Sequence, residues 1–250
     1  MMPNTDTALF EFLLRMGDNT LILGHRLSEW CGKGPILEED IALANTALDF
    51  IGQTQMWLGL AGEVEGAGRS ADDLAMLRDA WDFRCCLLVQ QPNGHFGQTM
   101  MRQFLFDHWH LGALRALKAS THDQIAAIAA KAEKEVTYQA ERSADLVIRL
   151  GDGTEESHAK MQGALDLLYP YVGELFTPNT ALPGIAPDPS ALRAAYDAAT
   201  GAVLSESTLC VPESRFAHQG GLTGARHSEH LGHLLTQMQW LQRAYPGASW

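Results

Sequence analysis

The sequence predicts an all-α protein, an antiparallel four-helix bundle with additional helices packed outside it. Apolar residues recur three and four positions apart along almost the whole chain, and no two-residue alternation bounded by hairpin turns occurs. Four long segments with this spacing are joined by short breakers, which is typical of an antiparallel bundle. The sequence has no internal repeat and no linker long enough to separate two domains, so residues 1–250 are expected to form a single domain.

Two long helices separated by a breaker are expected first. One is predicted over about residues 7–31 and ends at the Gly- and Pro-containing residues 32–35. The next is predicted over about residues 38–62, because its first residues are acidic, which suits a helix N-terminus. The face of this second helix that is expected to lie in the core carries Ile41, Ala44, Leu48, Ile51 and Leu58.

The remaining helices follow from the same spacing. A shorter helix is predicted over about residues 72–89, before a Gln-Pro-Asn-Gly turn. Two more long helices are predicted over about residues 96–119 and 121–150. The helices expected outside the bundle cover about residues 154–176, 190–206 and 227–243.

The charge of the chain excludes several classes of partner. Lys plus Arg number 18 against 30 Asp plus Glu, which gives a formal net charge of -12, so no general field attracts nucleic acid or anionic lipid. The N-terminus has no basic region followed by an apolar one, and no run of about 18 apolar residues occurs. We therefore expect a cytoplasmic protein that binds neither nucleic acid nor membrane. The four cysteines form no Cys-x-x-Cys pair, which favours buried free thiols.

Helical bundles build metal sites from side chains that face the core. A di-iron site needs two Glu-x-x-His motifs and a glutamate from each of two other helices. In this sequence Glu155 and His158 match the motif, but they fall in the first turn of a predicted helix, where the helix dipole explains acidic residues better than a metal does. We therefore assign no catalytic, cofactor-binding or metal-binding residue.

A second set of polar residues lies at positions expected to face inward. Asp107 falls on an apolar stripe, and Glu135 is followed by Tyr138 where a bundle oxygenase would have Glu-x-x-His. On the second helix Asp49 and Gln53 share a face without a histidine. The set has the outline of a carboxylate site whose imidazoles are missing, and the alternative is that its members are unrelated polar groups. We name Asp49, Gln53, Asp107, Glu135 and Tyr138 as a vestigial site in the bundle core.

Other histidines are predicted to have packing or surface roles. His25 and Glu29 lie four apart, the spacing of a hydrogen-bonded pair on a helix surface. Near the C-terminus, His227, His230 and His233 recur every three residues. Transition-metal binding is the alternative for this cluster. A packing or interface role is favoured, because residues three apart drift round a helix and no second cluster completes a known catalytic set.

Several short segments together resemble one known family. The resemblance extends from residue 16 to residue 243, and no single motif is diagnostic, but their order and combination are specific. The chain resembles the structural, non-catalytic subunits of bacterial 1,2-phenylacetyl-CoA epoxidases. The segments that carry the resemblance are MGDN at 16–19, RLSEWCG at 26–32, ALAN at 42–45, LDFIGQ at 48–53, QQPNG at 90–94 and HSEHLG at 227–232.

The resemblance implies a ferritin-like subunit of a multicomponent monooxygenase that uses dioxygen and NADPH to epoxidise phenylacetyl-CoA in aerobic phenylacetate degradation. Such a subunit pairs with a catalytic subunit that holds the di-iron site. A small bridging subunit joins the pair, and a reductase with flavin and an iron–sulfur centre supplies electrons. In the catalytic subunit the matching stretches carry Glu-x-x-His, so the resemblance accounts for the imidazoles missing near Gln53 and Tyr138.

Three functions compete on the sequence alone. The first is the structural subunit, which is not catalytic by itself. The second is an independent ferritin-like metal-dependent oxidase with an atypical carboxylate-rich site. The third is a module that binds the acyl-CoA, which the acidic charge of the chain disfavours because the coenzyme is polyanionic. The oxidase site would draw on Asp49, Asp107, His110 and Glu135, with His25.

Overall fold

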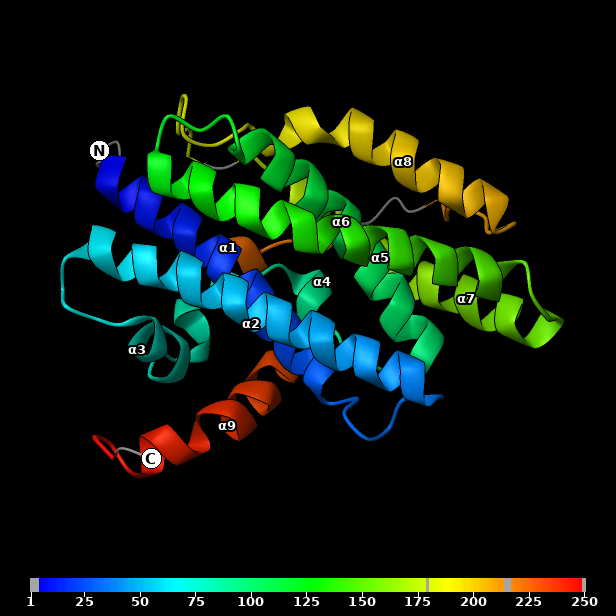
Figure 1. Cartoon of the computed structure of the whole chain (residues 1–250), viewed down its shortest axis with the longest axis horizontal. Helices are drawn as coiled ribbons and strands as arrows, with labels where there is room; N and C mark the ends of the chain where they lie inside the picture. The colour runs from blue at the N-terminus through cyan, green and yellow to red at the C-terminus, as the bar shows by residue number, and fades with distance from the viewer. Residues whose placement is uncertain (1–4, 179, 214–216, 249–250) are drawn as a thin grey trace. The chain divides into compact units, whose positions relative to one another are not determined.

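The computed structural model describes residues 5–178, 180–213 and 217–248, and every regular element among them is a helix (Figure 1). The all-α fold class predicted from the apolar spacing is therefore confirmed. The chain divides into two compact units, one of Met1–Pro92 with Gln219–Trp250 and one of Asn93–His218. A single ferritin-like domain over residues 1–250 stays a prediction.

Two long helices form the frame of the first unit. α1 covers Thr5–Ser28 and α2 covers Leu37–Glu65. Figure 1 shows α2 running alongside α1. The shorter elements of this unit are α3 (Ala71–Met76), the 3-10 turn η1 (Ala80–Asp82), α4 (Leu87–Gln90), the 3-10 turn η4 (Gly221–Thr223) and α9 (Glu229–Ala244).

α1 and α2 pack closely because glycines on α1 face α2. A Cβ added to Gly17 would lie 2.7 Å from Leu58 Cγ, and one added to Gly24 would lie 3.3 Å from the carbonyl oxygen of Ala47. The earlier glycine therefore meets the later part of α2, and the later glycine meets the earlier part. The two helices run antiparallel, as the bundle prediction requires.

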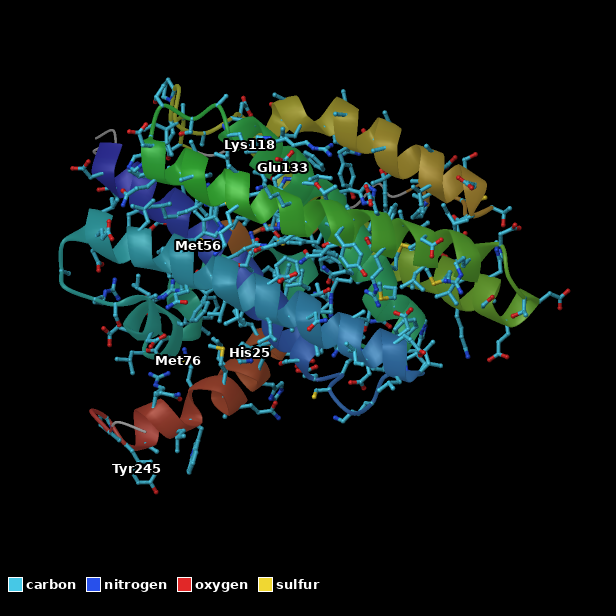
Figure 2. The ribbon with its side chains drawn as sticks, in the orientation of Figure 1. His25, Met56, Met76, Lys118, Glu133 and Tyr245 are labelled. Atoms are coloured by element: carbon cyan, nitrogen blue, oxygen red, sulfur yellow. The ribbon has the colours of Figure 1, made fainter. Side chains whose placement is uncertain are left out.

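The second unit is also framed by two long antiparallel helices, α5 (Phe96–Leu117) and α6 (Asp123–Gly151). Lys118 donates to Glu133 at 2.6 Å next to the turn between them, and Figure 2 shows these two side chains together. The four long helices of the prediction are thus present as two antiparallel pairs. The other elements of this unit are α7 (Glu155–Leu168), η2 (Tyr169–Phe176), η3 (Pro189–Leu192) and α8 (Arg193–Glu206).

The single helix predicted over about residues 72–89 is wrong. Only the short elements α3, η1 and α4 are helical there. The backbone N–H of Arg84 donates to Asp18 Oδ2 at 2.7 Å, and that of Cys86 donates to Asn19 Oδ1 at 2.8 Å. Because side chains of α1 satisfy these donors, the segment does not need helical hydrogen bonds.

The predicted core face of α2 is also largely wrong. Ile41, Leu48 and Ile51 are exposed, with 51%, 69% and 39% of their surface accessible. Apolar residues at this spacing cover more than one side of α2, so the three-and-four spacing cannot tell which side is buried. The large apolar side chains that α2 buries are Leu43, Phe50, Trp57, Leu58 and Leu60.

Glycine and proline account for two shifted boundaries. α2 continues past its expected end near Gly62 and stops at Gly66, whose φ of 69° gives a left-handed C-cap. The helix predicted over about residues 154–176 is α-helical only to Leu168 and continues as a 3-10 helix. Pro170 lies at the start of that 3-10 segment, where it cannot donate an α-helical hydrogen bond.

The cysteines are free, as predicted, but only half of them are buried. Cys85 and Cys86 are buried free thiols in the first unit, whereas Cys31 and Cys210 are exposed free thiols. The expectation of burial is therefore wrong for the last two, because both lie in irregular segments after the ends of helices.

Candidate functional site

A polar cluster lies inside the α5/α6 pair of the second unit. Asp107 on α5 is fully buried, and its Oδ1 accepts a hydrogen bond from Gln103 Nε2 at 2.6 Å, one turn earlier on the same helix. Its Oδ2 accepts from Ser143 Oγ on α6 at 3.0 Å. All three side chains are buried. We call Gln103, Asp107 and Ser143 the Asp107 cluster.

The position of Asp107 in the apolar sequence of α5 explains its burial. Phe104 precedes it by three residues and Leu111 follows by four, so all three lie on one side of the helix, and all are buried. On α6, Ser143 occupies a buried position among small residues, and its hydroxyl also lies 3.3 Å from the carbonyl oxygen of Ala140. A small hydroxyl residue there leaves room for a carboxyl from α5.

Burial governs the charge state of Asp107. Loss of solvation raises the pKa of its carboxyl to about 7, while the hydrogen bonds from Ser143 and Gln103 and the charge of Arg142 act in the opposite direction. The two hydrogen-bonding partners satisfy the carboxyl oxygens without supplying a compensating charge. Below pH 7 the neutral acid is therefore the main form.

His110 lies one turn beyond Asp107 on α5 and is also fully buried. Burial lowers the pKa of its imidazole to about 3, so the ring is neutral at physiological pH. The ring centroid lies 5.2 Å from that of Phe106 and 6.2 Å from that of Trp109. Two titratable groups in this part of α5 are thus both shifted by burial toward their uncharged forms.

The other members of the predicted vestigial site fall into different environments. Asp49 is half-buried and Gln53 buried, both on α2 in the first unit. Glu135 is half-buried on α6 in the second unit. That these residues join Asp107 in one bundle-core site stays a prediction.

Tyr138 does not face inward as the sequence suggested. It is 63% exposed. α6 buries Val136, Ala140 and Ser143, which lie four and three residues apart, and position 138 falls midway between the first two. The small residues of α6 mark its buried side, whereas the aromatic ring that appeared to be a core residue points away from it.

Sequence reasoning missed two residues of the Asp107 cluster. Gln103 could have been found, because it lies four residues before Asp107 on the same apolar side, and Gln and Asp at that spacing form a hydrogen-bonded pair on a helix. Ser143 has no such signal. Its role depends on which turn of α6 lies against Asp107, and no local pattern fixes that.

The first unit contains a buried ion pair between Arg78 and Asp18, which belongs to the MGDN segment. Arg78 Nη1 donates to Asp18 Oδ2 at 3.1 Å, and Arg78 Nη2 donates to Asp18 Oδ1. Both side chains are almost completely inaccessible. Arg78 also donates to the carbonyl oxygen of Asp82 at 3.0 Å, and its guanidinium lies 4.3 Å from the centre of the Phe83 ring. The pair therefore fastens the irregular segment after α3 to α1.

Three of the segments that carried the resemblance meet in the first unit around Gln90. Its Nε2 lies 2.9 Å from His227 Nδ1, and its Oε1 accepts from the backbone N–H of Ser228 at 2.8 Å. Arg26 Nη2 donates to the carbonyl oxygen of Gln90 at 2.8 Å. The packing role predicted for the C-terminal histidine cluster is confirmed for His227, whereas His233 is exposed.

The sequence contains two further pairs of a histidine and a glutamate, Glu155 with His158 and His25 with Glu29. Nδ1 of His158 lies 2.8 Å from the carbonyl oxygen of Gly151. Glu155 lies in the first turn of α7, as the helix-dipole interpretation predicts. His25, labelled in Figure 2, lies on α1 and is half-buried. Burial lowers the pKa of His25, while the charge of Glu29 acts to raise it.

Across residues 5–178, 180–213 and 217–248, no group of three or more His, Cys, Asp or Glu side chains is arranged to hold a metal ion. In the same ranges, no helix is both long enough and apolar enough to cross a membrane.

Comparison with known proteins gives concordant matches. The chain matches the family described as "Phenylacetic acid catabolic protein" over residues 1–250. It is 45% identical over 247 residues to a protein of Escherichia coli (strain K12) that is named as one of the subunits of 1,2-phenylacetyl-CoA epoxidase, and the match covers 97% of this chain and 99% of that protein. Both matches agree with the resemblance carried by the short segments of the sequence. The chain therefore belongs to the phenylacetic acid catabolic protein family.

Proposed function

We propose that this chain is the structural subunit of a 1,2-phenylacetyl-CoA epoxidase and does not itself carry iron. In this proposal residues 1–250 act as one ferritin-like domain in the cytoplasm and pair with a catalytic subunit that holds the di-iron centre. A small bridging subunit joins the assembly, and a reductase passes electrons from NADPH through flavin and an iron–sulfur centre. The similarity to the epoxidase subunit of Escherichia coli supports the assignment to this complex.

The observation that carries the non-catalytic role is the set of hydrogen bonds that Asp107 accepts. Iron in a helical bundle is bound by ionised carboxylates and neutral imidazoles. Here both carboxyl oxygens of Asp107 already accept hydrogen bonds, from the Gln103 amide and the Ser143 hydroxyl, and neither partner is a carboxylate or an imidazole. The residues that hydrogen-bond to Asp107 are therefore not those that a di-iron centre requires.

The position of Tyr138 supports the same conclusion. A di-iron bundle places a histidine three residues after the glutamate, with both side chains directed inward. After Glu135 that position holds Tyr138, whose side chain is largely exposed and so directed away from the core. The hypothesis of an independent oxidase would need Glu135 to bind metal without this partner.

The proposal is tested by measuring iron and turnover in the protein alone and in its complex. We expect the chain purified alone to contain far less than one iron per chain and to form no epoxide from phenylacetyl-CoA with dioxygen, NADPH and reductase. Co-purified with the catalytic subunit, the assembly should carry iron and turn over, and Asp107→Asn in this chain should change neither. Two irons per isolated chain, lost in Asp107→Asn, would instead establish the independent oxidase.

A further inference from the structure

α2 exposes a row of large aliphatic side chains. Leu37 is 72% exposed, Ile41 51%, Leu48 69% and Ile51 39%. Successive members lie four, seven and three residues apart, so they share one side of the helix, and Ala44 lies between them on the same side. We call Leu37, Ile41, Ala44, Leu48 and Ile51 the α2 stripe. Figure 1 shows the helix that carries it, from blue to cyan.

Most of the α2 stripe is not needed to hold α2 on its own unit, because Leu37, Ile41 and Leu48 are at least half exposed. α2 packs on α1 through Phe50, Trp57 and Leu58, which are completely buried, and at the edge of the stripe Ile51 also lies near α1, since a Cβ added to Gly24 would be 3.2 Å from Ile51 Cδ1. Single exposed apolar residues are ordinary on protein surfaces, as with Leu167 on α7, but a contiguous aliphatic row marks an interaction surface. A helix with large apolar residues beyond the side that packs on α1 is suited to a second packing partner.

The charge of α2 identifies the kind of partner. α2 contains no Lys or Arg, and its acidic residues are Glu38, Glu39, Asp40, Asp49, Glu63 and Glu65. Glu38 and Asp49 directly follow Leu37 and Leu48, so both lie along the same flank of the stripe. A second copy docked through the same face would bring these acidic flanks together, which like-charge repulsion opposes.

We propose that the α2 stripe is the docking face for the catalytic subunit of the epoxidase. The inference rests on the proposed function, which requires a larger partner subunit. We expect the partner to present a helix face with aliphatic residues at its centre and Lys or Arg along one edge. Because α2 is packed along α1, a partner held on the stripe is positioned by the frame of the first unit and not by a loop.

The test compares two matched substitutions in the full-length chain. Leu48→Asp introduces a charge into the middle of the stripe, and Leu167→Asp introduces the same charge at a helix position of similar exposure on α7. Binding to the purified catalytic subunit is measured by calorimetry. We expect Leu48→Asp to raise the Kd at least tenfold and Leu167→Asp to leave it within about twofold. Glu38→Lys should weaken binding more at low salt than at high salt.

The outcomes separate this inference from the function on which it rests. If the wild-type chain binds the catalytic subunit and Leu48→Asp binds equally well, the docking face is wrong while the proposed function stands. Equal weakening by both substitutions also refutes the docking face. A wild-type chain that does not bind the catalytic subunit refutes both. A wild-type dimer that Leu48→Asp dissociates would make a second copy the occupant. Unchanged circular dichroism verifies folding, and Leu37→Asp replaces Leu48→Asp if the latter unfolds.

Discussion

Replacing Asp107 by asparagine is expected to stabilise the protein, increasingly so as the pH rises. Asparagine has the size and planarity of the carboxyl but does not ionise. Its Oδ1 replaces the oxygen that accepts from Gln103, and its Nδ2 donates to Ser143 Oγ. The Ser143 hydroxyl then turns to the carbonyl oxygen of Ala140, 3.3 Å away. The polar atoms around position 107 therefore keep their partners, and only the charge is removed.

The size of the pH-dependent change in the free energy of unfolding follows from the pKa of Asp107, which burial raises from 3.8 to about 7. The folded state holds the proton more tightly than the unfolded chain does. The contribution of this group to stability is therefore complete below about pH 4 and is lost as the pH rises through about 7. At about 1.4 kcal/mol for each pKa unit, the loss reaches roughly 4 kcal/mol by pH 8. About 2–3 kcal/mol of it falls between pH 5 and pH 8.

The assay is urea unfolding of wild type and Asp107→Asn at pH 5, 6, 7 and 8. The difference in unfolding free energy should grow by about 2–3 kcal/mol over this range. Asp145→Asn on the exposed side of α6 is the control and should change stability by less than about 1 kcal/mol at each pH. A carboxylic-acid infrared band lost in Asp107→Asn would identify the protonated group. A difference that stays constant with pH would refute the neutral acid.

Two further substitutions test the packing of the first unit, again by urea unfolding. Arg78→Met leaves Asp18 charged and buried without its guanidinium, so it should cost about 3–5 kcal/mol, and a loss below about 1 kcal/mol would contradict a buried ion pair. Gly62→Ala places a Cβ 2.2 Å from the backbone oxygen of Arg69 and should destabilise by roughly 1–3 kcal/mol. Its control Gly59→Ala, with open space around the added Cβ, should stabilise by about 0.5–1 kcal/mol.

The long helices could be predicted because their signals are local. The segments expected over about residues 96–119 and 121–150 correspond to α5 at Phe96–Leu117 and α6 at Asp123–Gly151. The segment after α3 could not be predicted in this way. Its backbone donors are satisfied by side chains of α1, more than 60 residues earlier, and no pattern within the segment records those partners.

The buried side of α2 was predicted wrongly for a different reason. Aliphatic residues at helical spacing extend beyond its buried side, so the hydrophobic pattern alone fits more than one choice of core face. The buried side is the one that packs on α1, where Gly17 faces Leu58 and Gly24 faces Ala47 and Phe50. The aliphatic residues left outside form the α2 stripe, and for that reason the failed prediction and the proposed docking face concern the same residues.

The candidate site was partly predictable for a related reason. The apolar stripe of α5 placed Asp107 in the interior, and it is buried. Its chemistry could not be predicted, because the protonation state depends on Ser143 from another helix and on the degree of desolvation. Tyr138 was misplaced because it occupies the histidine position of a Glu-x-x-His motif after Glu135, whereas the side that α6 buries runs through Val136, Ala140 and Ser143.

Two of the buried acids, Asp18 and Asp107, show what a carboxylate in a helical core requires. Asp18 has the guanidinium of Arg78 beside it, which supplies the opposite charge inside the first unit. Asp107 accepts hydrogen bonds from the Gln103 amide and the Ser143 hydroxyl, which carry no charge. Burial therefore raises the pKa of its carboxyl, and the proton that it retains removes the charge. In a catalytic bundle that opposite charge comes from iron held by carboxylates and imidazoles. The missing imidazoles and the uncharged partners of Asp107 therefore both support the proposed structural role.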